Sequence, residues 1–236
     1  MKLTILAEGA TKWQRFIRRW GVSFLLDDEI LFDAFGRADI FKQNLEKFDV
    51  DIKKIKSVIL SHEHWDHVNG FKYLTTAQKE LTVYIPDGFS RKIKESISSP
   101  NIKFIETNKI TEIKNNVFIS ETLCGYLHGN KICEQSLVVK TDNGLSVICG
   151  CAHPGIDNIV KKIKRDFNEN IHTLIGGFHL KDNDENTNKL IINNLHEYGI
   201  QRIIPMHCTG KRAVEYIKEV FGQSFANIDE GDIIEL

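Results

Sequence analysis

The sequence predicts an α/β (α+β) fold with four layers in the order αββα, in which two mixed β-sheets pack face to face and helices cover their outer sides. Two observations predict it. The expected strands gather in two sets, one in each half of the chain, and helices accompany each set. The 236 residues, 42% of them hydrophobic, can bury a substantial core, and no linker-like stretch divides them. We therefore expect a single domain over residues 1–236.

Short apolar runs separated by turn residues predict an antiparallel meander at the start of the chain. Asp27, Asp28 and Glu29 form one of its turns, and Asp39 is expected to cap the first helix. In this part of the chain, strands are expected at 2–7, 22–26, 30–32 and 57–60, and a helix at 40–48.

After residue 67, helical and extended patterns alternate. Asp142, Asn143 and Gly144 predict a hairpin turn between two of the strands. Helices are expected at 70–79, 87–98, 156–167, 187–198 and 211–221. Strands are expected at 81–85, 102–106, 110–113, 117–122, 136–140, 145–149, 172–175 and 202–205, and one more at the C-terminus.

The charge balance argues against a polyanionic partner. Lysine and arginine number 31 against 32 acidic residues, so nothing in the net charge of −1 attracts nucleic acid or an anionic membrane. No apolar stretch approaches membrane-spanning length, and the apolar run at 3–7 is too short for a secretory signal. We expect a cytoplasmic protein whose oligomeric state the sequence leaves open.

Five cysteines are present, an odd number without CxxC spacing. A chain of this length does not need disulfides for stability. We therefore expect reduced thiols at Cys124, Cys133, Cys149, Cys151 and Cys208.

The strongest chemical signal is the run from Ser61 to His67, which follows a predicted buried strand. His62 and His64, two residues apart in an extended turn, can coordinate one ion. Asp66 and His67 can coordinate a second ion. Imidazole and carboxylate ligands suit zinc, iron, manganese or cobalt. The alternative is a solvated strand end whose histidines bind backbone carbonyls, but three imidazoles within six residues favour a shared ligand.

The pattern His62-x-His64-x-Asp66-His67 after a strand resembles the signature of the metallo-β-lactamase superfamily. The resemblance implies an αββα sandwich with two divalent metal ions, zinc first, with iron, manganese or magnesium as alternatives. Two later histidines are then the expected distal ligands. His153 lies in a Gly/Pro loop between a strand and a helix, and His207 follows a later strand.

A narrower resemblance covers the whole chain. Six segments, in order, are similar to the branch of dihydropterin-methyl ribofuranosylaminobenzene phosphate synthases, which implies a small anionic substrate, either a pterin or a phosphorylated compound. The six segments are 21–25, 30–33, 60–67, 150–156, 176–180 and 207–210.

Some positions depart from the usual pattern. Residues 32–36 replace an Asp-Thr-Gly turn, and Cys151 stands where the superfamily often places a bridging aspartate. A thiolate at Cys151 can ligate or bridge metal, and the alternative is an inert buried thiol. Asp33 is a candidate to orient a metal-bound histidine.

Other candidates surround the expected centre. Asp66 and His179 are the catalytic candidates, Asp66 as ligand and orienter and His179 as proton donor or substrate contact. His128 is a weaker rival to His153. Arg15, Arg18 and Arg19 alternate with Trp13, Phe16 and Trp20, so the segment either clamps an anionic ring-bearing substrate or is an amphipathic surface segment that buries its aromatics.

These observations predict a metal-dependent, dinuclear enzyme. The first choice is a synthase-like transfer with pyrophosphate loss, and the second is hydrolysis of a phosphodiester, lactone or thioester. A third hypothesis is a non-hydrolytic di-iron redox or metal-binding protein. The chain length leaves no room for the flavin-binding partner domain that such redox systems need.

Overall fold

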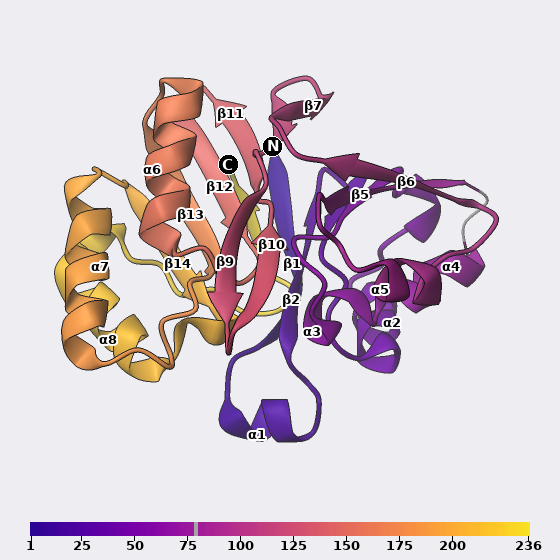
Figure 1. The fold of residues 1–236 in the computed structure, drawn as a ribbon, viewed down its shortest axis with the longest axis horizontal. Coiled ribbons are helices and arrows are strands. Elements are labelled where there is room, and N and C mark those ends of the chain that lie inside the picture. The colour runs from indigo at the N-terminus through magenta and orange to yellow at the C-terminus, as the bar shows by residue number, and fades with distance from the viewer. Residues whose placement is uncertain (78–79) are drawn as a thin grey trace. The chain divides into compact units, whose positions relative to one another are not determined.

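The computed structural model describes residues 1–77 and 80–236, and the chain separates into two compact units. Unit 1 comprises residues 1–108 and 229–236, and unit 2 comprises residues 109–228. Each unit contains one large mixed sheet with helices packed against it (Figure 1).

Unit 1 is built on a seven-stranded sheet with the order β15-β1-β2-β3-β4-β5-β6. The first four strands in this order pair antiparallel, and β3 to β6 pair parallel. Its strands are β1 (Lys2–Gly9), β2 (Gly21–Leu26), β3 (Ile30–Phe32), β4 (Ser57–Ile59), β5 (Leu81–Pro86), β6 (Ile102–Thr107) and β15 (Ile233–Glu235). Its helices are α1 (Lys12–Phe16), α2 (Ala38–Lys47), η1 (Ile52–Lys54), α3 (Trp65–Val68), α4 (Phe71–Ala77) and α5 (Arg91–Ser96).

One face of this sheet forms a core with its helices. Leu31 and Val58 on the strands pack with Phe41 and Leu45 of α2 and with Phe71 of α4. The alternate side chains of the strands are also buried, so β2 and β3 are apolar at every position except Ser23. This explains why these strands appear in the sequence as short continuous apolar runs.

Unit 2 contains a six-stranded sheet with the order β14-β13-β12-β11-β8-β7 and a separate hairpin of β9 and β10. β12, β13 and β14 are parallel, and the remaining pairs are antiparallel. Its strands are β7 (Thr111–Lys114), β8 (Val117–Ile119), β9 (Leu123–Leu127), β10 (Asn130–Glu134), β11 (Leu137–Thr141), β12 (Gly144–Cys149), β13 (Ile171–Gly177) and β14 (Arg202–Met206). Its helices are α6 (Ile156–Phe167), α7 (Glu185–Glu197), η2 (His207–Thr209), α8 (Lys211–Phe221) and η3 (Gly222–Ser224).

The three long helices of unit 2 cover one face of its sheet (Figure 1). Ile159 and Ile163 of α6, Ile192 of α7 and Ile217 of α8 pack on Leu174 and the other inward residues of the strands. Because α6 and α7 connect neighbouring parallel strands, the carboxyl ends of β12, β13 and β14 lie together at one edge of the sheet.

The predicted fold class is confirmed at the level of two mixed sheets with accompanying helices. The meander, the 142–144 hairpin turn and the helix at Lys211–Phe221 are observed where expected. The C-terminal strand, β15, returns to pair with β1, which no local pattern indicated. Residues 78 and 79, the expected end of the helix at 70–79, lie outside the described residues.

Several local predictions were wrong. Arg37, not Asp39, occupies the N-cap of α2, because the Asp39 carboxylate is held by the Arg37 guanidinium, with Nε 2.9 Å from Oδ1. The helix expected at 87–98 begins only at Arg91, because Pro86 extends β5 and Gly88 turns the chain with a φ of 88°. The helices α1 and α3 and the hairpin β9–β10 were not predicted.

The expectation of five reduced thiols was also wrong. Cys124 on β9 and Cys133 on β10 are directly opposite in the hairpin register and form a disulfide with an S–S distance of 1.99 Å. The pairing follows from the hairpin, which no local sequence pattern indicated. Cys149, Cys151 and Cys208 are buried thiols.

Candidate metal centre

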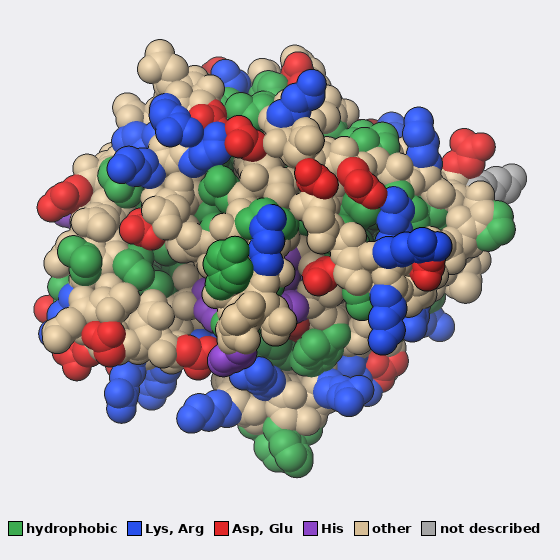
Figure 2. Space-filling view, viewed as in Figure 1, with side chains coloured by type: hydrophobic (Ala, Val, Ile, Leu, Met, Phe, Trp, Pro, Cys, Tyr) green, Lys and Arg blue, Asp and Glu red, His purple; other side chains and the backbone are tan. Residues whose placement is uncertain are grey.

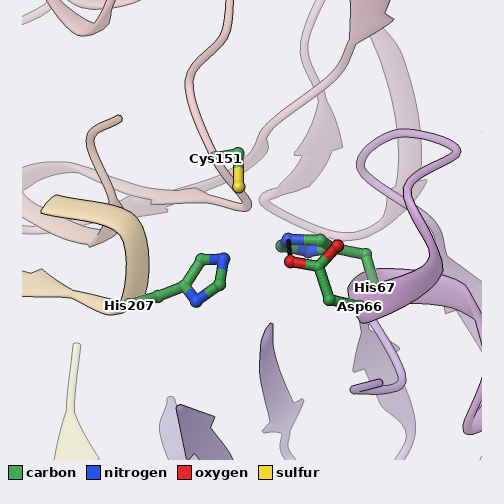
Figure 3. Close-up of side chains that lie close together, drawn as sticks. All are labelled: Asp66, His67, Cys151 and His207. Carbon is green, nitrogen blue, oxygen red and sulfur yellow. Dashed lines mark ion pairs between the residues drawn. The ribbon is translucent and has the colours of Figure 1, made fainter. Parts of the chain in front are cut away.

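In unit 1, potential metal ligands gather where β4 ends. The chain leaves β4 at Ile59 and enters α3 at Trp65, with His64 as the N-cap residue in an extended conformation. The ring of His62 lies 4.7 Å from that of His64 and 4.2 Å from that of His67, measured between centroids. Asp66 Oδ2 lies 3.5 Å from His67 Nε2, and Figure 3 shows both side chains on α3. The predicted tetrad is therefore one cluster.

Asp33 anchors this cluster from the end of β3. It is fully buried, and its carboxylate accepts hydrogen bonds from the backbone N–H and the hydroxyl of Ser61, both at 2.7 Å. Its Oδ2 also lies 2.6 Å from His67 Nδ1. Burial raises the pKa of Asp33 above its usual value, although the contacts with His67 and Ser61 oppose this shift. The structure therefore places Asp33 where it can fix the orientation of the His67 ring.

In unit 2, the candidate residues follow three neighbouring parallel strands. Cys151 and His153 come after β12, His179 after β13, and His207 begins η2 after β14. The ligand atoms of Cys151 and His207 lie within 4.8 Å of each other, and both side chains are drawn in Figure 3. The His153 and His179 rings are 4.5 Å apart between centroids. This edge of the sheet gathers all four.

Three candidate residues have left-handed backbones. The φ angles are 57° at Asp33, 50° at His179 and 52° at His207. Non-glycine residues rarely adopt this conformation, and such positions concentrate at functional sites. Here the conformation turns the chain sharply just beyond a strand, so that a polar side chain stays at the sheet edge.

Glu134, which the sequence analysis did not single out, holds the loop after β12. Its side chain is 1% exposed, and its Oε1 accepts hydrogen bonds from the backbone N–H groups of Cys151 and Ala152, both at 2.8 Å. Its Oε2 lies 3.0 Å from both the backbone N and the Nδ1 of His153. The glutamate is the last residue of the unpredicted strand β10, so no local signal pointed to it.

These contacts determine the ionisation of Glu134. Burial raises the pKa of the carboxyl, but hydrogen bonding and charge interaction with His153, together with the amides of Cys151 and Ala152, outweigh burial and lower the pKa to about 2. Glu134 is therefore a carboxylate at neutral pH, and it orients His153 through Nδ1.

His179 is kept neutral. Burial, followed by the nearby charges of His153 and Lys181, lowers the pKa of His179 to about 4. At neutral pH its imidazole carries one proton, which suits a hydrogen-bond or proton-transfer role better than a fixed positive charge. His128, the weaker rival to His153, lies exposed in the turn between β9 and β10.

The cationic and aromatic segment forms an excursion between β1 and β2, with α1 at its tip (Figure 1). Trp13 is 67% exposed and Phe16 is 80% exposed. Figure 2 shows hydrophobic side chains at the tip of this excursion and basic side chains near it. The alternative that this segment buries its aromatics is wrong for these two residues and correct only for Trp20. Arg19 pairs with Glu230, whereas Arg15 and Arg18 lie exposed.

No helix among the described residues combines the length and the apolar character needed to cross a membrane.

Comparison with known proteins confirms the resemblance. Residues 28–122 match the model of the Beta-lactamase superfamily domain. The whole chain aligns, at 27% identity, with 96% of the 7,8-dihydropterin-6-methyl-4-(beta-D-ribofuranosyl)-aminobenzene-5'-phosphate synthase of Methanocaldococcus jannaschii.

Solved structures establish the fold. The structure of Tm1679, described as a metal-dependent hydrolase of the beta-lactamase superfamily, is 28% identical, has a TM-score of 0.81, and aligns over 100% of this chain and 99% of that one. The metallo-beta-lactamase fold protein YhfI of Bacillus subtilis, 18% identical with a TM-score of 0.71 and 99% coverage of both chains, shares the fold. The chain has the metallo-β-lactamase fold.

Proposed function

We propose that this protein is a metal-dependent enzyme with a dinuclear centre. The ligands we propose are the contiguous residues His62, His64, Asp66 and His67, the later histidines His153 and His207, and the Cys151 thiolate. The observation that carries the proposal is that each unit gathers its donors at the ends of its strands, on loops with buried supporting carboxylates. The proposal requires residues 1–236 to work as a single catalytic domain.

The donor set fits a divalent transition metal. Imidazole, carboxylate and thiolate together suit zinc and also iron, and a site of this kind is less suited to magnesium, which prefers oxygen ligands. When bound, such ions would supply Lewis acidity that polarises an oxygen of water or substrate. Asp33 and Glu134 each bind a histidine through Nδ1, so both rings present Nε2 as the donor nitrogen.

The residues of the chain also suggest how a substrate is handled. His179 is neutral and adjacent to His153, so it can give a proton to a leaving group or hold a phosphate oxygen. In unit 1, the base of the α1 excursion lies against α3, because an added Cβ on Gly21 would stand 1.9 Å from the Asp66 carbonyl oxygen. Arg15 and Arg18 are exposed on this excursion, and we propose them as the cations that pair with an anionic substrate. Arg19 is already paired with Glu230.

The substrate class we favour is a small phosphorylated compound that carries a pterin or similar ring. Support comes from the full-length similarity to the M. jannaschii synthase. The proposed reaction transfers the dihydropterin group of a dihydropterin pyrophosphate to an aminobenzene riboside phosphate, with pyrophosphate as the leaving group, in a cytoplasmic enzyme. The second candidate is hydrolysis of a phosphodiester, lactone or thioester, favoured by the full-length similarity to the metal-dependent hydrolase Tm1679.

The first test is the metal content. We expect elemental analysis of the purified protein to give two equivalents of metal per chain. In a doubly substituted His62→Ala/His64→Ala variant the content should fall by about half or more. His128→Ala, which removes an exposed histidine of the β9–β10 turn, is the matched control and should keep the full content. Unchanged metal in the double variant would contradict the proposed ligands.

The second test separates the reactions. The metal-replete protein is incubated with a dihydropterin pyrophosphate and an aminobenzene riboside phosphate, and in parallel with phosphodiester, lactone and thioester probes. Pyrophosphate release that depends on both substrates supports the synthase. Turnover of a single probe supports the hydrolase instead. Iron content with dioxygen consumption and no turnover of either kind would overturn both in favour of a redox protein.

A further inference from the structure

A second pair of cysteines is held together inside unit 2, apart from the disulfide of the β9–β10 hairpin. Cys151 and Cys208 are 3% and 1% exposed. The Cys208 Sγ lies 3.4 Å from the Cys151 Sγ and 3.6 Å from the Cys151 carbonyl oxygen. The two residues are 57 positions apart, so only the fold brings them together.

The approach of the two sulfurs depends on a missing side chain. Cys151 follows β12 and Cys208 follows β14, so β13 runs between the strands that carry them. β13 ends in Gly177, where an added Cβ would stand 2.7 Å from the Cys208 Sγ and 2.4 Å from the Gly150 carbonyl oxygen. Any other residue at 177 would separate the two loops, so this glycine creates the space in which the sulfurs meet.

The third thiol of unit 2 behaves differently. Cys149 belongs to the apolar core beneath the helices, and its Sγ lies 3.5 Å from the Ser136 hydroxyl. It is fully buried, like Cys208, but its sulfur contacts a hydroxyl group. Burial in the unit therefore does not by itself produce a sulfur pair.

We propose that Cys151 and Cys208 form a redox-active dithiol that closes to a disulfide when no metal holds Cys151. For this the sulfurs need to approach from 3.4 Å to a disulfide bond length of about 2.05 Å. With hydrogen peroxide as oxidant, one sulfur attacks a peroxide oxygen, the O–O bond breaks, and a sulfenic acid and one water are formed. The second sulfur then displaces the sulfenic oxygen as a second water. Two S–H bonds are lost, one S–S bond forms, and the peroxide accepts the two electrons.

The consequence for metal binding rests on the proposed function. A sulfur in a disulfide cannot serve as a thiolate ligand, and His207 is the neighbour of Cys208 in η2. Closure of the bond would therefore remove one proposed ligand and move the backbone of a second. Bound metal would in turn protect the pair from oxidation, because a coordinated thiolate is less available to the oxidant.

The test uses the full chain, depleted of metal with a chelator and treated with hydrogen peroxide. Remaining thiols are blocked under denaturing conditions, and the digest is analysed by mass spectrometry without reduction. We expect a peptide pair linked through Cys151 and Cys208, lighter by two hydrogens than the two peptides together. The Cys149→Ser variant, which removes the core thiol, should still give this pair. The Cys208→Ser variant should not.

Three further results bear on the proposal. The proposal is overturned, whatever the metal content, if only Cys124 and Cys133 are found linked. In that outcome Cys151 and Cys208 are both recovered as blocked thiols or as higher oxidised acids. If the 151–208 link forms and oxidised protein takes up metal only after treatment with dithiothreitol, the coupling to metal is supported. If the link forms but metal uptake is unaffected, the dithiol stands, and the proposed role of Cys151 as a ligand fails.

Discussion

Glu134 offers the sharpest test of how the candidate centre is held together, through the substitution Glu134→Gln. The carboxylate accepts four hydrogen bonds, two at each oxygen, from the backbone N–H groups of Cys151, Ala152 and His153 and from His153 Nδ1. Glutamine keeps the shape but has only one acceptor oxygen. Its NH₂ group would face two N–H donors, so at least two of the four bonds are lost.

The magnitude follows from the burial of these groups. A hydrogen bond to a charged group contributes about 1.5 to 3 kcal/mol to stability. The Glu134 side chain is 1% exposed, so water cannot replace the hydrogen bonds that the substitution removes. We expect Glu134→Gln to lower the free energy of unfolding by roughly 3 kcal/mol or more. For a chain of this length each kcal/mol lowers the melting temperature by roughly 2 to 4 °C, so the shift should be at least about 6 °C.

The assay is thermal and urea unfolding of the metal-depleted protein, with Glu121→Gln as the matched control. Glu121 pairs with Lys162 in the same unit, but its side chain is 42% exposed, so its substitution should cost about 1 kcal/mol or less. A Glu134→Gln variant as stable as the Glu121→Gln variant would refute the reasoning that Glu134 fixes the loop after β12.

Three further predictions concern the same centre. Asp33→Asn, which weakens the contact to His67 Nδ1, should reduce zinc affinity by roughly 10- to 100-fold in a chelator competition, whereas unchanged affinity would exclude a role in orienting the ring. The pKa of His179 is lowered from 6.5 to about 4, so the protein should be destabilised as pH falls through this range, because the unfolded chain then binds a proton that the folded protein resists. We expect the free energy of unfolding to be unaffected by His179 above about pH 6.5 and to decrease by up to about 3 kcal/mol toward pH 4. In the His179→Gln variant, the free energy of unfolding measured over the same pH range should decrease less. Gly177→Ala should destabilise the protein by at least about 2 kcal/mol in urea unfolding, since its Cβ would stand 2.4 Å from the Gly150 carbonyl oxygen, and an unchanged midpoint would contradict this packing.

The sequence predicted those parts of the centre that are contiguous. His62, His64, Asp66 and His67 lie within six residues after one strand, so any turn that ends the strand keeps them close together. The structure gathers these four as expected and adds that Asp66 and His67 lie on a short helix, α3. Asp33 was a candidate because it lies at the turn after a predicted strand, and the structure adds that this strand, β3, pairs in parallel with β4.

Other features appeared only with the tertiary structure. Glu134 accepts hydrogen bonds from the loop that holds Cys151, and it lies on a hairpin that no local sequence pattern indicated. The sulfurs of Cys208 and Cys151 approach each other beside a strand that ends in glycine. Neither contact has a local pattern. Each depends on which strands are neighbours and on their register.

The sequence by itself determined most of the strands, the long helices and the cluster of three histidines and Asp66, because apolar periodicity and contiguous ligands are properties of short segments. Only the tertiary structure decided which buried carboxylate holds which histidine, which cysteines pair, and that the last strand returns to β1. The physical reason is that contacts between distant residues are selected by the packing of whole sheets, and the free energy of that packing is shared among many side chains.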